Sequence, residues 1–228
     1  MVWLWQNLEL VLGLALDHAR LSVVPIVVSF IVSIPLGWVA SQSRILRTIL
    51  LTLGGVLFTI PSIALFVTLP IILGTRILDE INVVVALSIY GVAVMVRGSA
   101  DAFASVSRDV IGSSTAVGFS RWGRFWSVEL PLAGPVLLAS IRVVSVTTVS
   151  LLSVGSLIGV TTLGYLFLDG YQRTFPTEVV IGIAFTVIIA LVFDAVLVAL
   201  GRLLMPYTRA LPKAGRASVT RVAAEVTS

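Results

Sequence analysis

Long apolar runs are the feature of this sequence that most constrains its fold. A helix needs roughly 20 predominantly apolar residues to cross the hydrocarbon core of a bilayer, which is about 30 Å thick. Several stretches of the chain are that long and that apolar, and only 11% of its 228 residues are charged, whereas a soluble domain carries roughly 25%. Alternating strands of about 10 residues, which mark an outer-membrane barrel, are absent from the sequence. We therefore predict an all-α, polytopic transmembrane helix bundle.

We expect about five membrane spans in a single domain that covers residues 1–205. The second expected span is longer than a crossing requires, and it is interrupted by Pro61 and Pro70, because proline lacks the N–H donor of a helix. Residues 1–16 are expected to form an interfacial helix anchored by Trp3 and Trp5, since tryptophan lies at headgroup level. The five expected spans are Leu21–Ala40, Ile45–Leu73, Asn82–Val96, Gly134–Val160 and Glu178–Leu204.

Charge asymmetry predicts the orientation of these spans. With the loop around Gly118 placed in the cytoplasm, eleven basic residues fall inside and three fall outside, which is the bias of the positive-inside rule. Five spans then put the N-terminus outside and the C-terminus inside. Residues 206–228 become a basic cytoplasmic tail, either a loosely ordered extension or a segment that binds anionic membrane lipid. The inside set is Arg44, Arg47, Arg97, Arg108, Arg121, Arg124, Arg202, Arg209, Lys213, Arg216 and Arg221, and the outside set is Arg20, Arg76 and Arg173.

A polar segment that contains arginine, residues 107–135, interrupts the apolar sequence between the third and fourth expected spans. It reads SRDVIGSSTAVGFSRWGRFWSVELPLAGP and is too polar to enter lipid. We expect one or two short helices there, with Gly118 relaxing the backbone between them because glycine accepts a positive φ at no steric cost. Pro131 fits the first turn of the following helix. Such a segment is either a surface-lying hairpin without a partner or a docking element on the cytoplasmic side.

The same segment resembles the signature of the integral-membrane permease subunits of ABC importers. That signature reads roughly E-A-A, three residues, Gly, a spacer, an apolar residue and L-P. In this sequence its places are taken by Ser114-Thr115-Ala116, which lacks the acidic residue, and by Gly118 and Leu130-Pro131. The stretch STAVGFSRWGRFWSVELPLAGP is similar to EAARGMGMTRWQ…VELPLALP of the glycine betaine, carnitine and choline branch. TIPSIAL at 59–65, IRV at 141–143, and LIG at 157–159 with LG at 163–164 resemble further motifs of that branch.

The resemblance implies the type I ABC importer permease fold and a place in the bacterial cytoplasmic (inner) membrane. It implies that the segment of about 105–131 is a coupling helix that seats in a groove of an ATP-binding subunit. The expected partners are two ABC ATP-binding subunits, a second permease that is identical or homologous, and an extracytoplasmic solute-binding protein, with no nucleic acid. The residues expected to couple to the ATPase are Ser114, Thr115, Ala116, Gly118, Phe119, Arg121, Trp122, Arg124, Leu130 and Pro131.

No Walker-type phosphate-binding sequence occurs in the chain, so ATP and Mg²⁺ are expected on the partner ATPase, with no cofactor and no catalytic residue here. The resemblance implies import of a compatible solute or quaternary amine such as glycine betaine, choline or carnitine; another small solute, such as methionine, is the alternative.

Thr59, Pro61, Ser62 and Tyr90 are expected in the translocation path, although a packing kink explains Thr59–Ser62 equally well. Aromatic faces that suit a quaternary ammonium group are offered by Phe58, Phe66, Tyr90, Tyr165, Phe167 and Tyr171.

The remaining polar residues and glycines support few other functions. Arg142 and Asp194 lie within expected spans, where ionisable groups are costly; a pairing of the two is one alternative if their helices run antiparallel, and a structural role is favoured over a proton relay. Gly155 and Gly159 have a spacing that allows close helix approach, at a dimer contact or within the chain. His18, the single histidine, is expected at the interface outside the first span and not as a metal ligand. Without an internal repeat a secondary carrier is disfavoured, and one histidine with no cysteine disfavours a membrane enzyme or a metal site.

Overall fold

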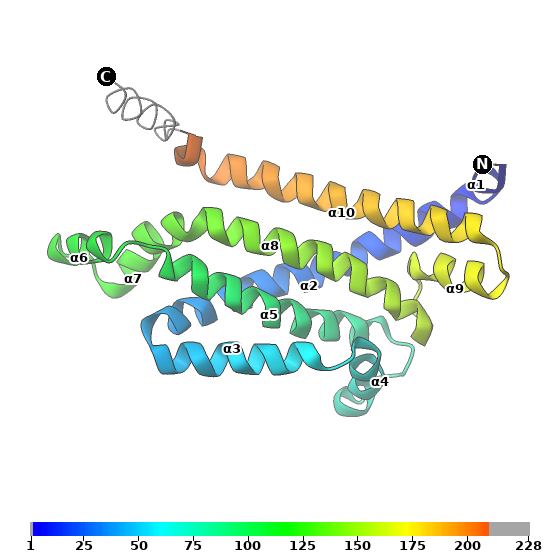
Figure 1. The fold of residues 1–228 in the computed structure, drawn as a ribbon, viewed down its shortest axis with the longest axis horizontal. Helices are drawn as coiled ribbons and strands as arrows, with labels where there is room; N and C mark the ends of the chain where they lie inside the picture. The colour runs from blue at the N-terminus through cyan, green and yellow to red at the C-terminus, as the bar shows by residue number, and fades with distance from the viewer. Residues whose placement is uncertain (1, 210–228) are drawn as a thin grey trace, which may run out of the picture.

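The structure, a computed structural model, describes residues 2–209, most of which are helical, with no strand among them. Five long helices lie along one axis (Figure 1), with α3 and α10 at opposite edges and α2, α5 and α8 between them. The long helices are α2 (Leu8–Gln42), α3 (Arg44–Thr59), α5 (Glu80–Ala104), α8 (Leu130–Leu152) and α10 (Pro176–Leu204). The shorter ones are α1 (Val2–Gln6), α4 (Ser62–Leu73), α6 (Arg108–Ala116), α7 (Arg121–Arg124) and α9 (Gly164–Gln172).

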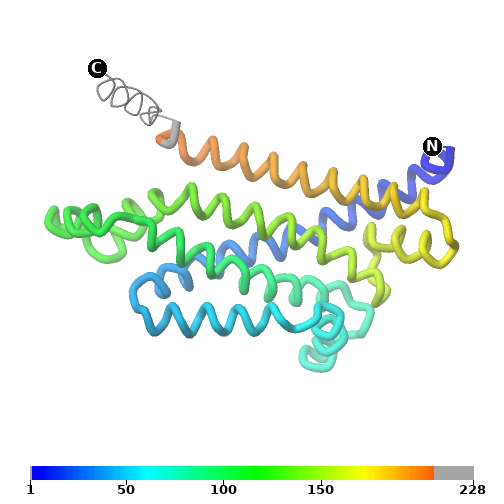
Figure 2. The backbone as a smooth tube through the Cα atoms, in the orientation of Figure 1, coloured from blue at the N-terminus to red at the C-terminus, as the bar shows by residue number. Residues whose placement is uncertain are grey.

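The lengths of the helices confirm a polytopic bundle. Helices α2, α5, α8 and α10 are each long and apolar enough to cross a membrane, and the bent pair α3–α4 makes a fifth span if it is counted as one. The two ends of the bundle differ: α6 and α7 extend from one, here the α6 end, and α1, α4 and α9 lie at the other, here the α9 end (Figure 1). The described chain starts at the α9 end and finishes at the α6 end (Figure 2), as an odd number of crossings requires.

The second expected span breaks at one of its two prolines. Helix α3 ends at Thr59, and α4 starts at Ser62 with its axis bent by 99°. The residue before a proline is pushed to extended backbone, and Ile60 accordingly has φ −65° and ψ 128°. Pro70 does not interrupt the chain as predicted, since it lies inside α4, where a helical φ suits its ring. Gly74, at φ 68°, then ends α4.

The prediction of a separate interfacial helix over residues 1–16 is wrong. Helix α2 begins at Leu8 and continues to Gln42, so most of that segment belongs to the first long helix. His18 therefore lies within the bundle and is fully buried, not interfacial. Its Nδ1 accepts a hydrogen bond from the Leu163 amide at 3.3 Å, which leaves Nε2 to donate to the Val149 carbonyl at 2.9 Å. The histidine thus joins α2 to the end of α8 and to the start of α9.

Two further expectations are settled by the backbone after α8. The fourth expected span ran to Val160, but α8 ends at Leu152 and a 3₁₀ turn, Ser153–Ile158, follows. Gly159 has φ 86° and caps that turn, so Gly155 and Gly159 are not on successive turns of an α-helix. Both glycines do pack closely within the chain, since an added Cβ would lie 3.5 Å from Val83 at Gly155 and 2.8 Å from Leu78 at Gly159. The basic tail expected over 206–228 lies outside the described residues from 210 onward; a 3₁₀ turn forms Pro206–Arg209.

Close packing around α5 sets the centre of the bundle. Buried apolar side chains of α2, α5 and α8 form the core of the α6 end, among them Trp38, Phe103 and Ile141. A second cluster at the α9 end joins α4 to α5 through Phe66 and Leu87. Between helices, glycine faces serine so closely that an added Cβ would lie about 2 Å from the serine, which is the small-residue packing of membrane helices. These pairs are Gly37 with Ser99 (2.3 Å), Gly91 with Ser29 (1.9 Å) and Gly98 with Ser140 (2.2 Å).

Candidate functional site

The predicted coupling segment folds into two short helices that extend beyond the ends of the long ones (Figure 1). Helix α6 starts after Ser107, whose side chain accepts a hydrogen bond from the Asp109 amide at 3.3 Å. Helix α7 starts after Ser120, which accepts from the Gly123 amide at 3.1 Å. Serine at both N-caps is favoured because its hydroxyl satisfies an amide that the helix leaves without a partner. A π-helical turn, Phe125–Glu129, then leads into α8.

Gly118 ends α6 and reverses the chain. Its φ is 98°, a left-handed conformation that glycine adopts without steric cost. The Phe119 amide donates to the Ser114 carbonyl at 3.1 Å, and the Gly118 amide donates to the Thr115 carbonyl at 3.0 Å. These two bonds make a Schellman cap. The glycine of the sequence motif is therefore the residue that lets α6 and α7 form a compact corner.

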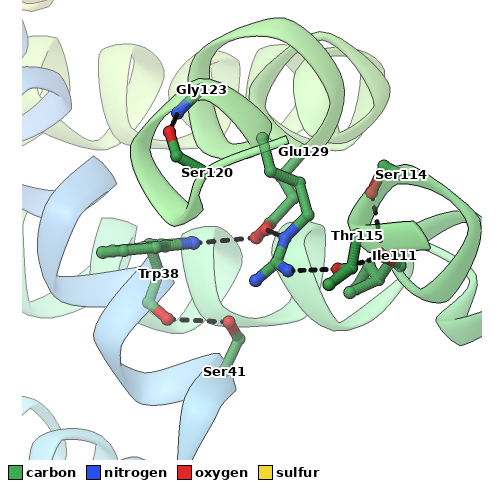
Figure 3. A network of polar contacts seen from close by, with 9 residues as sticks. Trp38, Ser41, Ile111, Ser114, Thr115, Ser120, Gly123 and Glu129 are labelled. Carbon is green, nitrogen blue, oxygen red and sulfur yellow. Dashed lines mark hydrogen bonds and ion pairs between the residues drawn. The ribbon is translucent and has the colours of Figure 1, made fainter. Parts of the chain in front are cut away.

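A buried carboxylate attaches this corner to the bundle (Figure 3). Glu129 is 3% exposed, and its Oε2 accepts a hydrogen bond from Trp38 Nε1 of α2 at 2.7 Å. Its Oε1 accepts from Arg124 Nε, also at 2.7 Å, and Arg124 Nη1 donates to Thr115 Oγ1 on α6 at 2.8 Å. One chain of charge-assisted bonds thus runs from α2 through the π-helical turn and α7 to α6.

Aromatic rings surround that network. Trp38 lies 5.0 Å from Phe125 and 5.5 Å from Trp122, measured between ring centroids. The Arg121 guanidinium carbon lies 5.0 Å above the Trp38 ring, within cation–π range. Phe125 is buried, whereas Trp122 and Trp126 are exposed, as suits the headgroup level of a membrane. The rings therefore fix α7 against α2 and leave α6 free on its outer side.

The predicted coupling residues divide into a supporting set and a surface set. Ser114 is buried and donates to the Ile111 carbonyl of its own helix, Arg124 belongs to the Glu129 network, and Leu130 and Pro131 open α8. The surface set is Thr115, Ala116, Gly118, Phe119, Arg121 and Trp122. Val110 and Val117 join it, and Val117 is 79% exposed. Trp38 and Glu129 were not among the predicted coupling residues, although Glu129 is part of the VELPL stretch that resembles the family motif.

The four residues predicted for a translocation path come together around the α3–α4 break. Thr59 and Pro61 are exposed, Ser62 is half-buried, and all three lie beside Ile60. Tyr90 of α5 is buried, and its hydroxyl donates to the Ile60 carbonyl at 2.6 Å. The ring of Phe58 packs edge-to-face on Tyr90 with centroids 5.8 Å apart. Of the other aromatic candidates, Phe66 is fully buried and Tyr165 and Tyr171 are exposed near the α9 end.

Arg142 and Asp194 form an ion pair, an alternative that the sequence left open. Arg142 Nε lies 2.5 Å from Asp194 Oδ1, and Nη2 lies 2.8 Å from Oδ2, so the guanidinium binds the carboxylate with both donors. The pair joins α8 to α10 within two helices that are apolar enough to span a membrane. Its position matches the rule that intramembrane charges pair with one another.

Asp194→Ala is expected to reduce the yield of folded protein, because it leaves the Arg142 charge without a partner between apolar helices. The double variant Arg142→Leu/Asp194→Leu is expected to recover most of that yield, since it removes both charges. Size-exclusion profiles of the detergent-purified variants measure the effect. If the double variant is recovered no better than Asp194→Ala, the pair does not stabilise the fold in this way.

Comparisons with known proteins agree with this geometry. Residues 33–210 match the family model "Binding-protein-dependent transport system inner membrane component". The chain is 32% identical over 151 residues to the osmoprotectant import permease protein OsmY of Salmonella typhimurium, an alignment that covers 66% of this chain and 62% of the relative. It is 28% identical over 190 residues to the glycine betaine/carnitine/choline transport system permease protein OpuCD of Bacillus subtilis, covering 83% and 82%.

A third relative and a solved structure extend the comparison. The osmoprotectant import permease protein OsmW of Salmonella typhimurium is 28% identical over 207 residues, which cover 90% of this chain and 96% of the relative. Among solved structures, an inward-facing conformation of the MetNI methionine ABC transporter has the same fold, with a TM-score of 0.70 at 20% identity over 85% of this chain and 97% of that one. The match over residues 33–210 makes this chain a member of the family of inner membrane components of binding-protein-dependent transport systems, the permease subunits of ABC importers.

Proposed function

We propose that the chain is the permease subunit of an ATP-driven importer for a compatible solute or quaternary amine such as glycine betaine, choline or carnitine. The names of its relatives support that substrate class. One observation supports the coupling role above all: the corner formed by α6 and α7 is exposed, and the buried Glu129 network attaches it to the bundle. Two ATP-binding subunits supply the energy, and an extracytoplasmic solute-binding protein delivers the solute.

The surface of the α6 corner has the chemistry of a docking element. Val110, Val117 and Phe119 are exposed apolar side chains, and Arg108 and Arg121 are exposed beside them. An apolar helix face with flanking charges suits a groove in a partner: the apolar contacts provide affinity and the charges fix the register. Because Glu129 ties the corner to α2 and α8, a push on α6 is transmitted to the spans. Coupling then follows if ATP favours one of the two arrangements of the spans.

The orientation follows from the distribution of charge between the two ends. Arginines gather at the α6 end, which is therefore cytoplasmic, and the N-terminal α9 end is outside. The described arginines at the α6 end are Arg44, Arg47, Arg97, Arg108, Arg121, Arg124, Arg202 and Arg209.

A second permease, identical or homologous, completes the membrane part. The Arg142 side chain is 43% exposed in the single chain, and a charged pair within a span avoids lipid. Helix α10 buries few of its own residues, among them Gly182 and Ile189. Both observations favour a protein surface or a water-filled path beside α8 and α10 in the assembled transporter.

Val117→Glu is expected to weaken binding of the ATP-binding subunit by about tenfold or more, because it places a charge on the apolar docking face. Ile77→Glu is the matched control, since Ile77 is 67% exposed at the opposite end of the bundle. Co-purification of the ATP-binding subunit with each tagged variant gives the measurement. Equal retention of the subunit by both variants would contradict docking at α6.

The substrate is tested with the full complex in proteoliposomes together with its solute-binding protein. Glycine betaine, choline and carnitine, each radiolabelled, are expected to accumulate only when ATP is present on the α6 side. Methionine is the comparison solute, because the likeness to the methionine transporter establishes the fold alone. Accumulation of methionine but of none of the three amines would reject the proposed substrate class.

A further inference from the structure

Helix α3 packs against α2 and α5 but buries little of its own surface. Among its sixteen residues, all of them described, only Gly54 is buried. Gly54 lies against α5, where an added Cβ would be 3.0 Å from the Ala93 carbonyl oxygen. At the α6 end, Arg47 pairs with the Asp101 carboxylate of α5. The third attachment is at the far end of α3, where Tyr90 of α5 binds the Ile60 carbonyl.

The Ile60 carbonyl needs that bond because the α3–α4 break leaves it outside both helices. The Ile60 amide turns back to the Leu57 carbonyl at 3.3 Å, and the first α4 bond, from the Leu65 amide, goes to the Pro61 carbonyl at 3.2 Å. Pro61 holds Ile60 in extended backbone, so its carbonyl points away from the helix path. An unpaired carbonyl in a membrane protein is costly, and the Tyr90 hydroxyl, at 2.6 Å, supplies the donor.

Tyr90 itself is firmly placed. Its side chain is 3% exposed, and its ring contacts Phe58 edge-to-face. The next residue, Gly91, packs directly on Ser29 of α2, so the backbone that carries the tyrosine is fixed in the centre of the bundle. A rigid donor therefore meets the carbonyl at the end of a helix that has one buried residue of its own.

We propose that Tyr90 is a positioning residue for transport: its hydrogen bond latches the α3–α4 junction to α5, and the latch opens when α3 moves between the two arrangements of the spans. This inference rests on the proposed function for its role in transport. The latch itself is a property of the chain. Removing the Tyr90 hydroxyl leaves the ring in place but breaks its bond to the Ile60 carbonyl. The α3–α4 junction can then separate from α5 even when the other spans do not move.

The latch is tested first by the accessibility of Ser62, the half-buried residue after Pro61. The chain contains no cysteine, so Ser62→Cys provides a single thiol. In native membranes, Tyr90→Phe is expected to raise the rate at which a charged maleimide labels this thiol about three- to tenfold, the change in opening equilibrium that loss of one hydrogen bond produces. Ser88→Ala is the matched control, because Ser88 lies on the same helix and its hydroxyl bonds only to the Val84 carbonyl.

A second thiol reports on effects away from the junction. Ile77→Cys is exposed in the α4–α5 loop, and its labelling rate is expected to be the same with Tyr90 and with Tyr90→Phe. An unchanged labelling rate at Ser62→Cys in the Tyr90→Phe background would overturn the latch. Equal increases at both thiols, or an equal increase with Ser88→Ala, would overturn it as well, because they would show general loosening.

Transport gives the functional readout, on Tyr90→Phe without any added cysteine. The solute concentration for half-maximal uptake is expected to stay the same, while the number of solute molecules imported per ATP hydrolysed falls about three- to tenfold. An unchanged ratio would overturn the role in transport. If the unaltered complex imports none of the amines, the proposed function fails, whereas the labelling experiment still decides whether the latch exists.

Discussion

Glu129→Ala is expected to lower the free energy of unfolding by about 3–5 kcal/mol, the cost of removing one partner of a buried ion pair. Glu129 is 3% exposed and accepts hydrogen bonds from Trp38 and from Arg124. Its loss leaves a guanidinium that is 16% exposed without its carboxylate, and it removes the hydrogen bond from Trp38 that ties the corner to α2. Denaturation of the purified protein measures the stability, and co-purification of the ATP-binding subunit measures the docking.

Two companion variants sharpen that experiment. Ser127→Ala, at an exposed position of the same π-helical turn, is expected to change stability by less than about 0.5 kcal/mol. Glu129→Gln keeps an acceptor for Trp38 but loses the charge that faces Arg124, so it is expected to fall between the two. A stability of Glu129→Ala equal to that of Ser127→Ala would show that the buried network does not hold the corner.

Gly37→Ala is expected to destabilise the bundle by about 1–3 kcal/mol through overpacking between α2 and α5. An added Cβ at Gly37 would lie 2.3 Å from the Ser99 Cβ and 2.7 Å from the Ser99 carbonyl carbon. Because one of those atoms is backbone, a side-chain rotation cannot relieve the overlap, and the two helices must separate.

Gly55→Ala is expected to change the stability in the opposite direction from Gly37→Ala. Gly55 lies within α3, and no atom lies within 4 Å of an added Cβ there. Alanine is expected to stabilise that helix by about 0.5–1 kcal/mol, since glycine is the poorer helix former. Thermal unfolding of both variants in one detergent provides the measurement. A destabilisation of Gly55→Ala as large as that of Gly37→Ala would reject close packing as the cause.

The sequence predicts the long helices well because each must bury about a membrane's thickness of apolar side chains. It also locates the break at Pro61, whose ring excludes helical backbone at Ile60. It misplaces the N-terminal segment, because Asp17 and His18 read as polar interface residues. In the folded chain Asp17 lies beside Arg20, and His18 bonds to backbone groups 131 and 145 residues away.

In the candidate site, too, features that depend on local sequence are predictable, whereas contacts that depend on the packing of distant segments are not. Gly118 and the corner it makes are predictable, since the left-handed backbone is a local property of glycine. The pairing of Arg142 with Asp194 is predictable too, because each is an ionisable residue in an apolar span that offers few partners. The bond from Trp38 to Glu129 joins residues 91 positions apart, and the bond from Tyr90 to Ile60 joins residues 30 apart. Neither follows from local pattern, since the first needs the packing of α2 against the π-helical turn and the second needs the packing of the α3–α4 junction against α5.

The most direct test of the central claim, that the α6 corner couples this permease to an ATPase, is to purify the tagged chain from native membranes in mild detergent and identify its stoichiometric partners by mass spectrometry. We expect an ATP-binding subunit in the complex, either with a second, different permease or with this chain as the only permease. Recovery of the chain without any ATP-binding subunit, repeated under gentler extraction, would contradict it.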